Sequence, residues 1–295
     1  MSTPVISQVQ QEQGQSSHTR KNLFRRLEKE LQRPLVSYYT SVSANRPASI
    51  EDSDADIIDG VLRELDLAKG LALLINSHGG YGEAAERIIN VCRSASGTGE
   101  FWAIVPGKAK SAATMICFGA SKILMGASSE LGPIDPQLTV TEDGKKKRFS
   151  VWNLVEGYKE LFQKAVKEKG NLEPCLLQLK AYDARDIKEW ETAIALSEDI
   201  AVRSLASGML KGESETNIRK KIHMFLTPEE KKSHGRPIYS DEAKGCSLEI
   251  DKFEPKSNLG ELIYELHVRT ANFVRTKAYK CVESKDAGFS APYED

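Results

Sequence analysis

The hydrophobic residues in the first half of the chain follow two alternating patterns. Continuous apolar runs, which predict strands buried in a sheet, occur at residues 35–39, 70–75, 101–105 and 122–125. Runs with apolar positions at helical spacing, which predict helices, occur at residues 57–65, 84–92 and 111–119. Strand and helix therefore alternate three times along this part of the chain. That order predicts an α/β fold with a parallel sheet and right-handed crossovers.

Weaker patterns flank this predicted core. Residues 138–151 predict a surface hairpin, and residues 152–226 predict several helices that pack outside the sheet. A long helix is expected at residues 259–281, before a polar tail. The first 18 residues are rich in Gln and Ser, which is typical of a disordered leader. The expected organisation is a leader at 1–18, one folded domain at 19–254, and a C-terminal helix with a polar tail at 255–295.

Composition excludes several classes of partner and location. The 41 Lys and Arg residues balance the 42 Asp and Glu residues, and a net charge of −1 argues against a nucleic-acid partner. No apolar stretch approaches the roughly 20 residues that cross a bilayer, so we expect no integral membrane segment. The N-terminus lacks the features of a secretory signal, which predicts a cytoplasmic protein. The five cysteines are scattered without a CxxC pair, which predicts free thiols and no metal site.

Two glycine-containing turns, at residues 76–80 and 106–110, directly follow predicted strands. Ligands of parallel α/β sheets bind beyond the carboxyl ends of the strands, so we expect both turns to meet at one crevice. Gly79 or Gly80 lets the backbone aim an N–H at a developing oxyanion, although such a turn also serves as a tight connection. Ser111 opens the next helix, where it is either a nucleophile near the helix dipole or only an N-cap.

Three motifs make the sequence resemble a known family. They are NSHGG at residues 76–80, SAAT at residues 111–114, and SELGPIDPQ at residues 129–137. Their order and spacing resemble the serine dehydrogenase proteinase family, in the clan of the Clp proteolytic subunit, signal peptide peptidase A and the crotonases. The resemblance runs from about residue 20 to residue 250. It implies a Clp protease/crotonase-like parallel β-sheet core with repeated ββα/βαβ units, flanking helices and an added C-terminal helix.

The resemblance also implies roles for individual residues. Ser111 matches the nucleophile of the clan, and residues 19–254 would form its serine hydrolase domain. The N–H groups of Gly79 and Ala112 match the oxyanion hole, with Gly80 beside them.

The general base does not follow directly from the motifs. The Clp pattern places a histidine in the loop where this chain has Gly-Pro-Ile-Asp-Pro. We prefer His234 as the base, with Asp135 orienting it, because triads are defined by geometry and not by chain order. A lysine base, as in signal peptide peptidases, is the alternative at Lys110 or Lys122. His78 is the third candidate.

These assignments predict a protease: a serine endopeptidase-like hydrolase that cleaves peptide bonds of a peptide or protein substrate without a cofactor. Because clan members enclose their active sites in assemblies, we expect a homo-oligomer. Two other functions remain open. A crotonase-like acyl-CoA enzyme uses the same type of oxyanion hole without a serine at the helix start. A catalytically inactive Clp-like scaffold or partner-binding module is favoured by the missing histidine.

Overall fold

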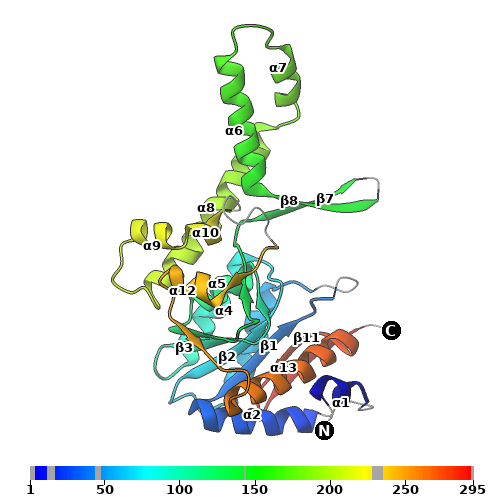
Figure 1. Cartoon of the computed structure of the whole chain (residues 1–295), viewed down its shortest axis with the longest axis vertical. Helices are drawn as coiled ribbons and strands as arrows, with labels where there is room; N and C mark the ends of the chain where they lie inside the picture. The colour runs from blue at the N-terminus through cyan, green and yellow to red at the C-terminus, as the bar shows by residue number, and fades with distance from the viewer. Residues whose placement is uncertain (1–3, 12–16, 44–47, 143, 228–234, 294–295) are drawn as a thin grey trace.

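One seven-stranded sheet organises the molecule (Figure 1). A computed structural model describes residues 4–11, 17–43, 48–142, 144–227 and 235–293. In spatial order the strands are β10 (Ile250–Lys252), β5 (Lys122–Met125), β3 (Phe101–Val105), β2 (Leu71–Asn76), β1 (Leu35–Thr40), β11 (Ala278–Glu283) and β12 (Gly288–Pro292). The pairs from β10 to β1 are parallel, whereas β11 and β12 are antiparallel to their neighbours. The sheet is therefore mixed and mostly parallel.

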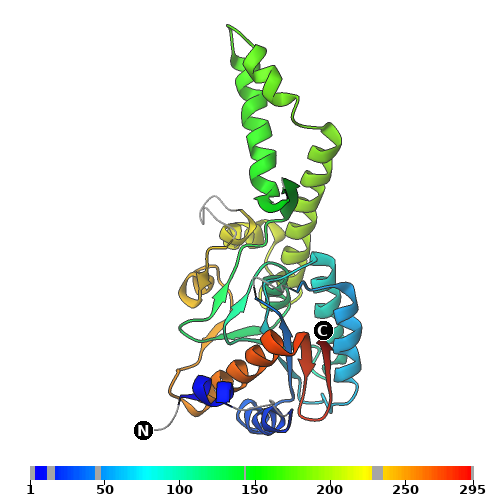
Figure 2. The ribbon, with the colours of Figure 1, turned by 90° about the vertical axis from the view of Figure 1, so that its right-hand side faces the viewer.

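Helices cover both faces of this sheet, which explains the continuous apolar strands. The crossover helices α3 (Asp52–Leu62), α4 (Gly82–Ala95) and α5 (Ala112–Phe118) bury their apolar residues against one face. The other face is covered by α2 (Ser17–Leu31) and α13 (Asn258–Thr276), as Figure 2 shows. Along β2, Leu73 points to the first cluster of buried side chains and Leu74 to the second. The predicted alternation of strand and helix is confirmed.

A helical arm projects from this α/β body (Figures 1 and 2). The predicted hairpin is confirmed as β7 (Gln137–Glu142) and β8 (Lys145–Ser150). The arm itself comprises α6 (Val151–Lys167), α7 (Glu173–Leu179) and the first part of α8 (Ala184–Ala206). Ile200 and Leu205, near the end of α8, are buried in the main core. The arm is thus anchored at its base and free of the sheet along most of its length.

Shorter elements complete the chain beside the carboxyl ends of the strands. A second sheet joins β4 (Lys108–Ala109), β6 (Glu130–Leu131) and β9 (Ile238–Tyr239). Around it lie α9 (Glu215–Lys221), α10 (His223–Leu226) and α12 (Ser240–Gly245). Within the described ranges, every helix is either too short or too polar to span a lipid bilayer.

Both ends of the chain differ from the sequence prediction. Within the predicted leader, residues 5–11 form α1 (Val5–Gln11), because the apolar side chain of Val9 is buried where this helix meets α13. The predicted helix at 259–281 ends at Thr276, and β11 and β12 replace its last turn and the polar tail. The physical reason is that β1 would otherwise be the edge strand of the sheet. Its backbone hydrogen-bonding groups on that side are satisfied by β11, which pairs with it in antiparallel register.

Candidate active site

The two glycine-containing turns meet, as predicted, at the carboxyl ends of β2 and β3. The Ser77 N–H donates to the Lys108 carbonyl oxygen at 2.9 Å, and the Lys110 N–H donates to the Ser77 carbonyl oxygen at 3.1 Å. The Asn76 side-chain oxygen accepts a third bond from the Lys108 N–H at 3.0 Å. These bonds fix the segment that leads into Ser111 against the segment that carries the paired glycines.

Ser111 has an unusual backbone conformation at the start of α5. Its φ of 51° and ψ of −122° lie in a region that residues with a side chain seldom adopt. Among described non-glycine residues, only Gln32 and Ser247 share a positive φ. Although Ser111 is the N-cap residue, its side chain makes no capping hydrogen bond. The hydroxyl of this half-buried serine is therefore not used to hold the helix.

Gly79 packs directly against Ser111. Its φ is +101°, and a Cβ at this position would lie 2.7 Å from Ser111 Cβ and 2.6 Å from the Lys110 carbonyl oxygen. The same Cβ would lie 3.0 Å from the Ala112 nitrogen. Gly80 is equally restricted, because a Cβ there would overlap the backbone of Ile50. Both glycines are thus required by close backbone approach and not only by a tight connection.

The backbone N–H groups near Ser111 differ in their hydrogen bonds. The Gly79 N–H donates to Ser77 Oγ at 3.0 Å, and Ser77 Oγ is 2.7 Å from Thr40 Oγ1. Within the described part of the chain, the N–H groups of Gly80 and Ala112 have no hydrogen-bond partner. The sequence analysis did not identify Ser77 and Thr40. The only sequence feature that marks them is that a residue with a hydroxyl group stands at the end of β1 and another directly after the end of β2.

Lys110 is buried and precedes Ser111, but its ammonium group binds other residues. Its ammonium group donates to the Leu131 carbonyl oxygen at 2.9 Å and forms an ion pair with Glu130 at 3.2 Å. Burial lowers the pKa of Lys110, while the negative charge of Glu130 opposes that change. Among the described hydrogen bonds, none joins Lys110 to the Ser111 hydroxyl. Lys110 therefore supports the 130–132 segment in this conformation.

Lys122 lies away from Ser111. It begins β5 and pairs with Trp102 near the start of β3, whereas Ser111 follows the other end of β3. Its ammonium group binds Asp251 at 2.5 Å and lies 3.8 Å from the centre of the Trp102 ring. Because parallel strands begin at one edge of the sheet and end at the other, the structure does not bring Lys122 to the site.

His78 lies between the paired glycines and a group of cations. Partial burial is the main cause that lowers its pKa, followed by the positive charges of Lys108, Lys110 and Arg148. Glu130 has the opposite, smaller effect. A lowered pKa keeps this imidazole neutral at pH 7, which is the form that can accept a proton. The His78 side chain is exposed to solvent and is in the protonation state that a base requires.

Asp135 is buried, with 1% of its surface exposed, and accepts a hydrogen bond from the Gln137 side chain at 2.7 Å. It shares a small cavity with Thr227, the last described residue before segment 228–234. His234 belongs to that segment and lies outside the described residues. The described chain resumes at Gly235, and three residues later Ile238 pairs with Leu131. Both flanks of the segment thus lie next to the 130–135 loop.

The described residues of the site do not form an arrangement typical of a metal centre. In the part of the chain that the structure describes, no three His, Cys, Asp or Glu side chains are placed to hold a metal ion. All five cysteines are buried, and none of them forms a disulfide. Burial raises the pKa of the Cys92 thiol to about 12, so this cysteine is a packing residue and not a nucleophile.

Comparison with known proteins identifies a sequence relative. The chain matches no protein-family profile. An uncharacterized protein of Methanocaldococcus jannaschii is 29% identical over 218 residues, which cover 74% of this chain. Those residues make up 64% of the relative, so this chain spans less than two thirds of the relative's length.

Two solved structures that the chain resembles are mutants of the 1510-N membrane-bound stomatin-specific protease, one of them in complex with a substrate peptide. They are 17% and 15% identical to this chain, with TM-scores of 0.31 and 0.29. The matches cover 70% and 73% of this chain and 94% and 92% of theirs. Likenesses at these TM-scores do not bear on the site, which rests on the geometry of this chain.

Proposed function

We propose that this protein is a serine peptidase-type hydrolase, with Ser111 as its nucleophile and a fold of the Clp/crotonase clan. The observation that carries the proposal is the conformation of Ser111. A positive φ at a strand-to-helix turn exposes a serine hydroxyl in the way that nucleophile elbows do, and the strain is retained only where the surroundings impose it. The absence of a side-chain cap bond at Ser111 supports a role other than capping.

The proposed reaction is acyl transfer to Ser111. Its Oγ attacks the carbonyl carbon of a peptide bond while a base takes the hydroxyl proton. The carbonyl oxygen becomes an oxyanion, which would be held by the N–H of Ala112 and an N–H of Gly79 or Gly80. The amine leaves with the proton, and water then hydrolyses the acyl-enzyme. For Gly79 to contribute, its N–H must exchange or share its bond to Ser77 Oγ.

His234 remains our proposed base, with Asp135 as the residue that orients it. The support is the position of the flanks of segment 228–234, at Thr227 beside Asp135 and at Ile238 beside Leu131. His78 is the alternative, because its lowered pKa keeps it neutral near the paired glycines. Lys110 would have to lose a proton and move away from Glu130 and Leu131 before it could act as a base.

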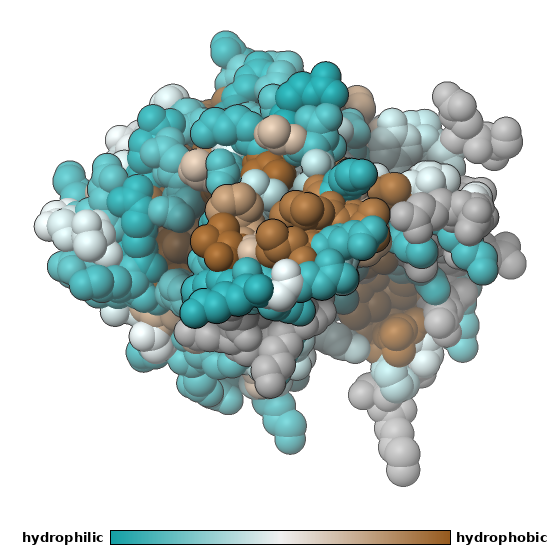
Figure 3. Space-filling view, turned by 90° about the horizontal axis from the view of Figure 1, so that it is seen from above, coloured by the Kyte–Doolittle hydropathy of each residue, from teal (hydrophilic) through white to brown (hydrophobic). Residues whose placement is uncertain are grey.

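The arm supports the proposal of a homo-oligomer. Exposed apolar side chains occur on α6, on α7 and at the residue that precedes α7, and Figure 3, which looks down on the arm, shows apolar surface gathered there. They are Phe162, Val166, Leu172, Leu176 and Leu177. A large exposed apolar surface marks an interaction site, and a second copy of this chain supplies the same apolar surface. Buried cysteines that form no disulfide are compatible with the reducing cytoplasm, where we propose that the protein acts.

A fluorophosphonate probe tests the proposal, because it reacts covalently with activated serines. We expect the wild type to be labelled at Ser111, mapped by mass spectrometry, and the Ser111→Ala variant to be unlabelled. Ser121→Ala is the matched control, since this half-buried serine follows the end of α5. Loss of labelling in His234→Ala would support the proposed base, whereas retained labelling would favour His78 or Lys110. An unlabelled wild type would overturn the hydrolase and favour the partner-binding scaffold.

A further inference from the structure

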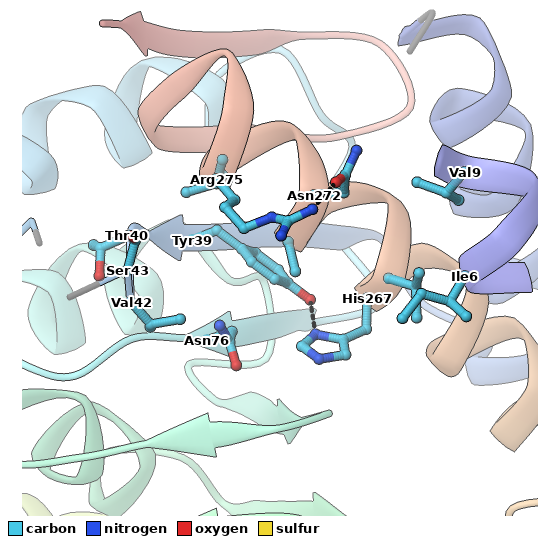
Figure 4. Close-up of a pocket in the computed structure, with 13 residues that line it drawn as sticks. Ile6, Val9, Tyr39, Thr40, Val42, Ser43, Asn76, His267, Asn272 and Arg275 are labelled. Atoms are coloured by element: carbon cyan, nitrogen blue, oxygen red, sulfur yellow. Dashed lines mark hydrogen bonds between the residues drawn. The ribbon is translucent and has the colours of Figure 1, made fainter. Parts of the chain in front are cut away.

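A cavity of about 420 Å³ lies beside the carboxyl ends of β1 and β2, on the face of the sheet that α13 covers (Figure 4). It is enclosed by α1, by the residues that follow β1, and by α13. Its volume falls in the range of small-molecule sites. Thr40 and Asn76 belong to its lining and also contact the segments that lead to Gly79 and Ser111, whereas the proposed nucleophile and oxyanion-hole residues do not line it. The cavity therefore requires an explanation of its own.

Most of the cavity wall is apolar. Ile6 and Val9 enter from α1, Val42 from the segment after β1, and Val268 and Ala271 from α13. These short aliphatic side chains come from three separate segments, and the aromatic rings that line the same cavity are those of Tyr39 and His267. Such a wall favours a flexible aliphatic chain over a planar ring, because apolar contact is the interaction it offers.

The deeper polar groups of the cavity are uncharged and already paired. Tyr39 Oη and His267 Nδ1 are 3.0 Å apart, as the dashed line in Figure 4 shows. Burial lowers the pKa of His267 to about 4, so the imidazole is neutral at pH 7. The side-chain oxygen of Asn76 is held by the Lys108 N–H. The inner end of the cavity thus has no charge that would oppose an apolar chain.

One charged side chain belongs to the lining, and it lies at the rim. The Arg275 guanidinium donates to Asn272 at 2.8 Å and points over the cavity (Figure 4). Among the described residues, no carboxylate forms an ion pair with Arg275, and no acidic residue lines the cavity. A single exposed guanidinium matches a single carboxylate, with which it forms two parallel hydrogen bonds.

We propose that this cavity binds an aliphatic monocarboxylate of the fatty-acid type. Its chain lies between α1 and α13, and its carboxylate binds Arg275. One guanidinium neutralises one carboxylate, whereas a phosphate dianion would keep an uncompensated charge beside an apolar wall. The site is distinct from Ser111, so binding does not depend on whether the protein is a hydrolase.

Titration calorimetry of the full chain with decanoate tests the proposal, and decanol of equal chain length measures the contribution of the charge. We expect saturable binding of one decanoate per chain and at least about tenfold weaker binding of decanol, the size of one charge-assisted contact. Arg275→Gln should weaken decanoate binding by about the same factor and leave decanol binding unchanged. Lys277→Gln is the matched control, because this exposed cation two residues later does not line the cavity.

A second variant tests the location of the chain. Ala271→Trp fills the cavity, and we expect it to abolish binding of both compounds while its circular dichroism and thermal unfolding show a folded protein. Val42→Trp fills the cavity from the opposite wall and replaces that test if the helix variant does not fold. Binding that survives in a folded filling variant, equal affinity for decanoate and decanol, or no saturable binding to the wild type would each overturn the proposal.

Discussion

Gly79 and Gly99 both have a positive φ but differ in what an added methyl group would contact. At Gly79 the methyl group would overlap the carbonyl oxygen of Lys110 and the Cβ of Ser111. At Gly99 no atom beyond the neighbouring residues lies within 4 Å of the added methyl group. Gly99→Ala should therefore cost only the backbone strain, about 1 kcal/mol. Gly79→Ala should cost more and reduce fluorophosphonate labelling at least about tenfold, the effect of losing one oxyanion contact. Equal labelling of the two variants would contradict a close contact between Gly79 and the reacting group.

His267 gives the folded protein a pH-dependent stability. Its pKa is lowered from 6.5 to about 4, mainly by burial, so the unfolded state binds a proton that the folded state does not. The free energy of unfolding should thus be highest above pH 6.5 and fall as the pH decreases towards 4. The loss attributable to this residue is about 3 kcal/mol. Denaturant titrations between pH 7.5 and 4 should show a shallower decline in His267→Gln than in the wild type.

Individual residues of the site differed in how far the sequence revealed them. The positions of Ser111 and Gly79 were predictable, because a strand-turn-helix pattern places them at the carboxyl ends of adjacent strands. Their contact is confirmed, while their catalytic roles stay predictions. The hydroxyl pair Thr40 and Ser77 was not predictable, since the two residues meet only after β1 and β2 pair. His234 lies outside the described residues, so its role also stays a prediction.

At the scale of elements, the buried parallel strands were predictable and β11 was not. A strand such as β2 has helices on both sides, so its continuous apolar run is a local signal. In β11 Tyr279 is exposed, Glu283 is partly buried and the other four residues are buried, so the segment lacks the regular alternation of a half-buried strand. What makes this segment a strand is pairing with the edge of β1, which lies more than 200 residues earlier in the sequence. No local pattern contains that information.

The arm allows a prediction about assembly. Phe162 is 50% exposed on α6, and placing a charge there should disrupt a contact between apolar surfaces. We expect Phe162→Glu to shift the protein to a smaller species in light scattering coupled to size-exclusion chromatography. Gln163→Glu adds the same charge at the next exposed position of the helix and should leave the distribution unchanged. A monomeric wild type would rule out the arm as a self-association surface at the concentration used.

At the scale of the whole molecule, an ion pair joins the two ends of the described chain. Arg20 in α2 makes two hydrogen bonds to Glu283 in β11, at 2.7 and 2.6 Å, and its side chain is 3% exposed. Removing one partner of a buried pair leaves an uncompensated charge, so Glu283→Gln should lower the free energy of unfolding by about 3 kcal/mol. Asp59→Asn, which breaks the exposed pair with Arg63, should cost less than about 1 kcal/mol. Similar urea midpoints for both variants would contradict this difference.

The pairing of β1 with β11 also governs how the chain can fold. β1 is synthesised early and can pair with β2 as soon as β2 is made. Its other edge has no partner strand until more than 200 further residues have been synthesised. Contacts of such high sequence separation are slow to form because a long loop must close first. During translation the edge of β1 is therefore an open template for pairing with another chain. Aggregation of nascent chains should be most pronounced when synthesis stalls between α13 and β11.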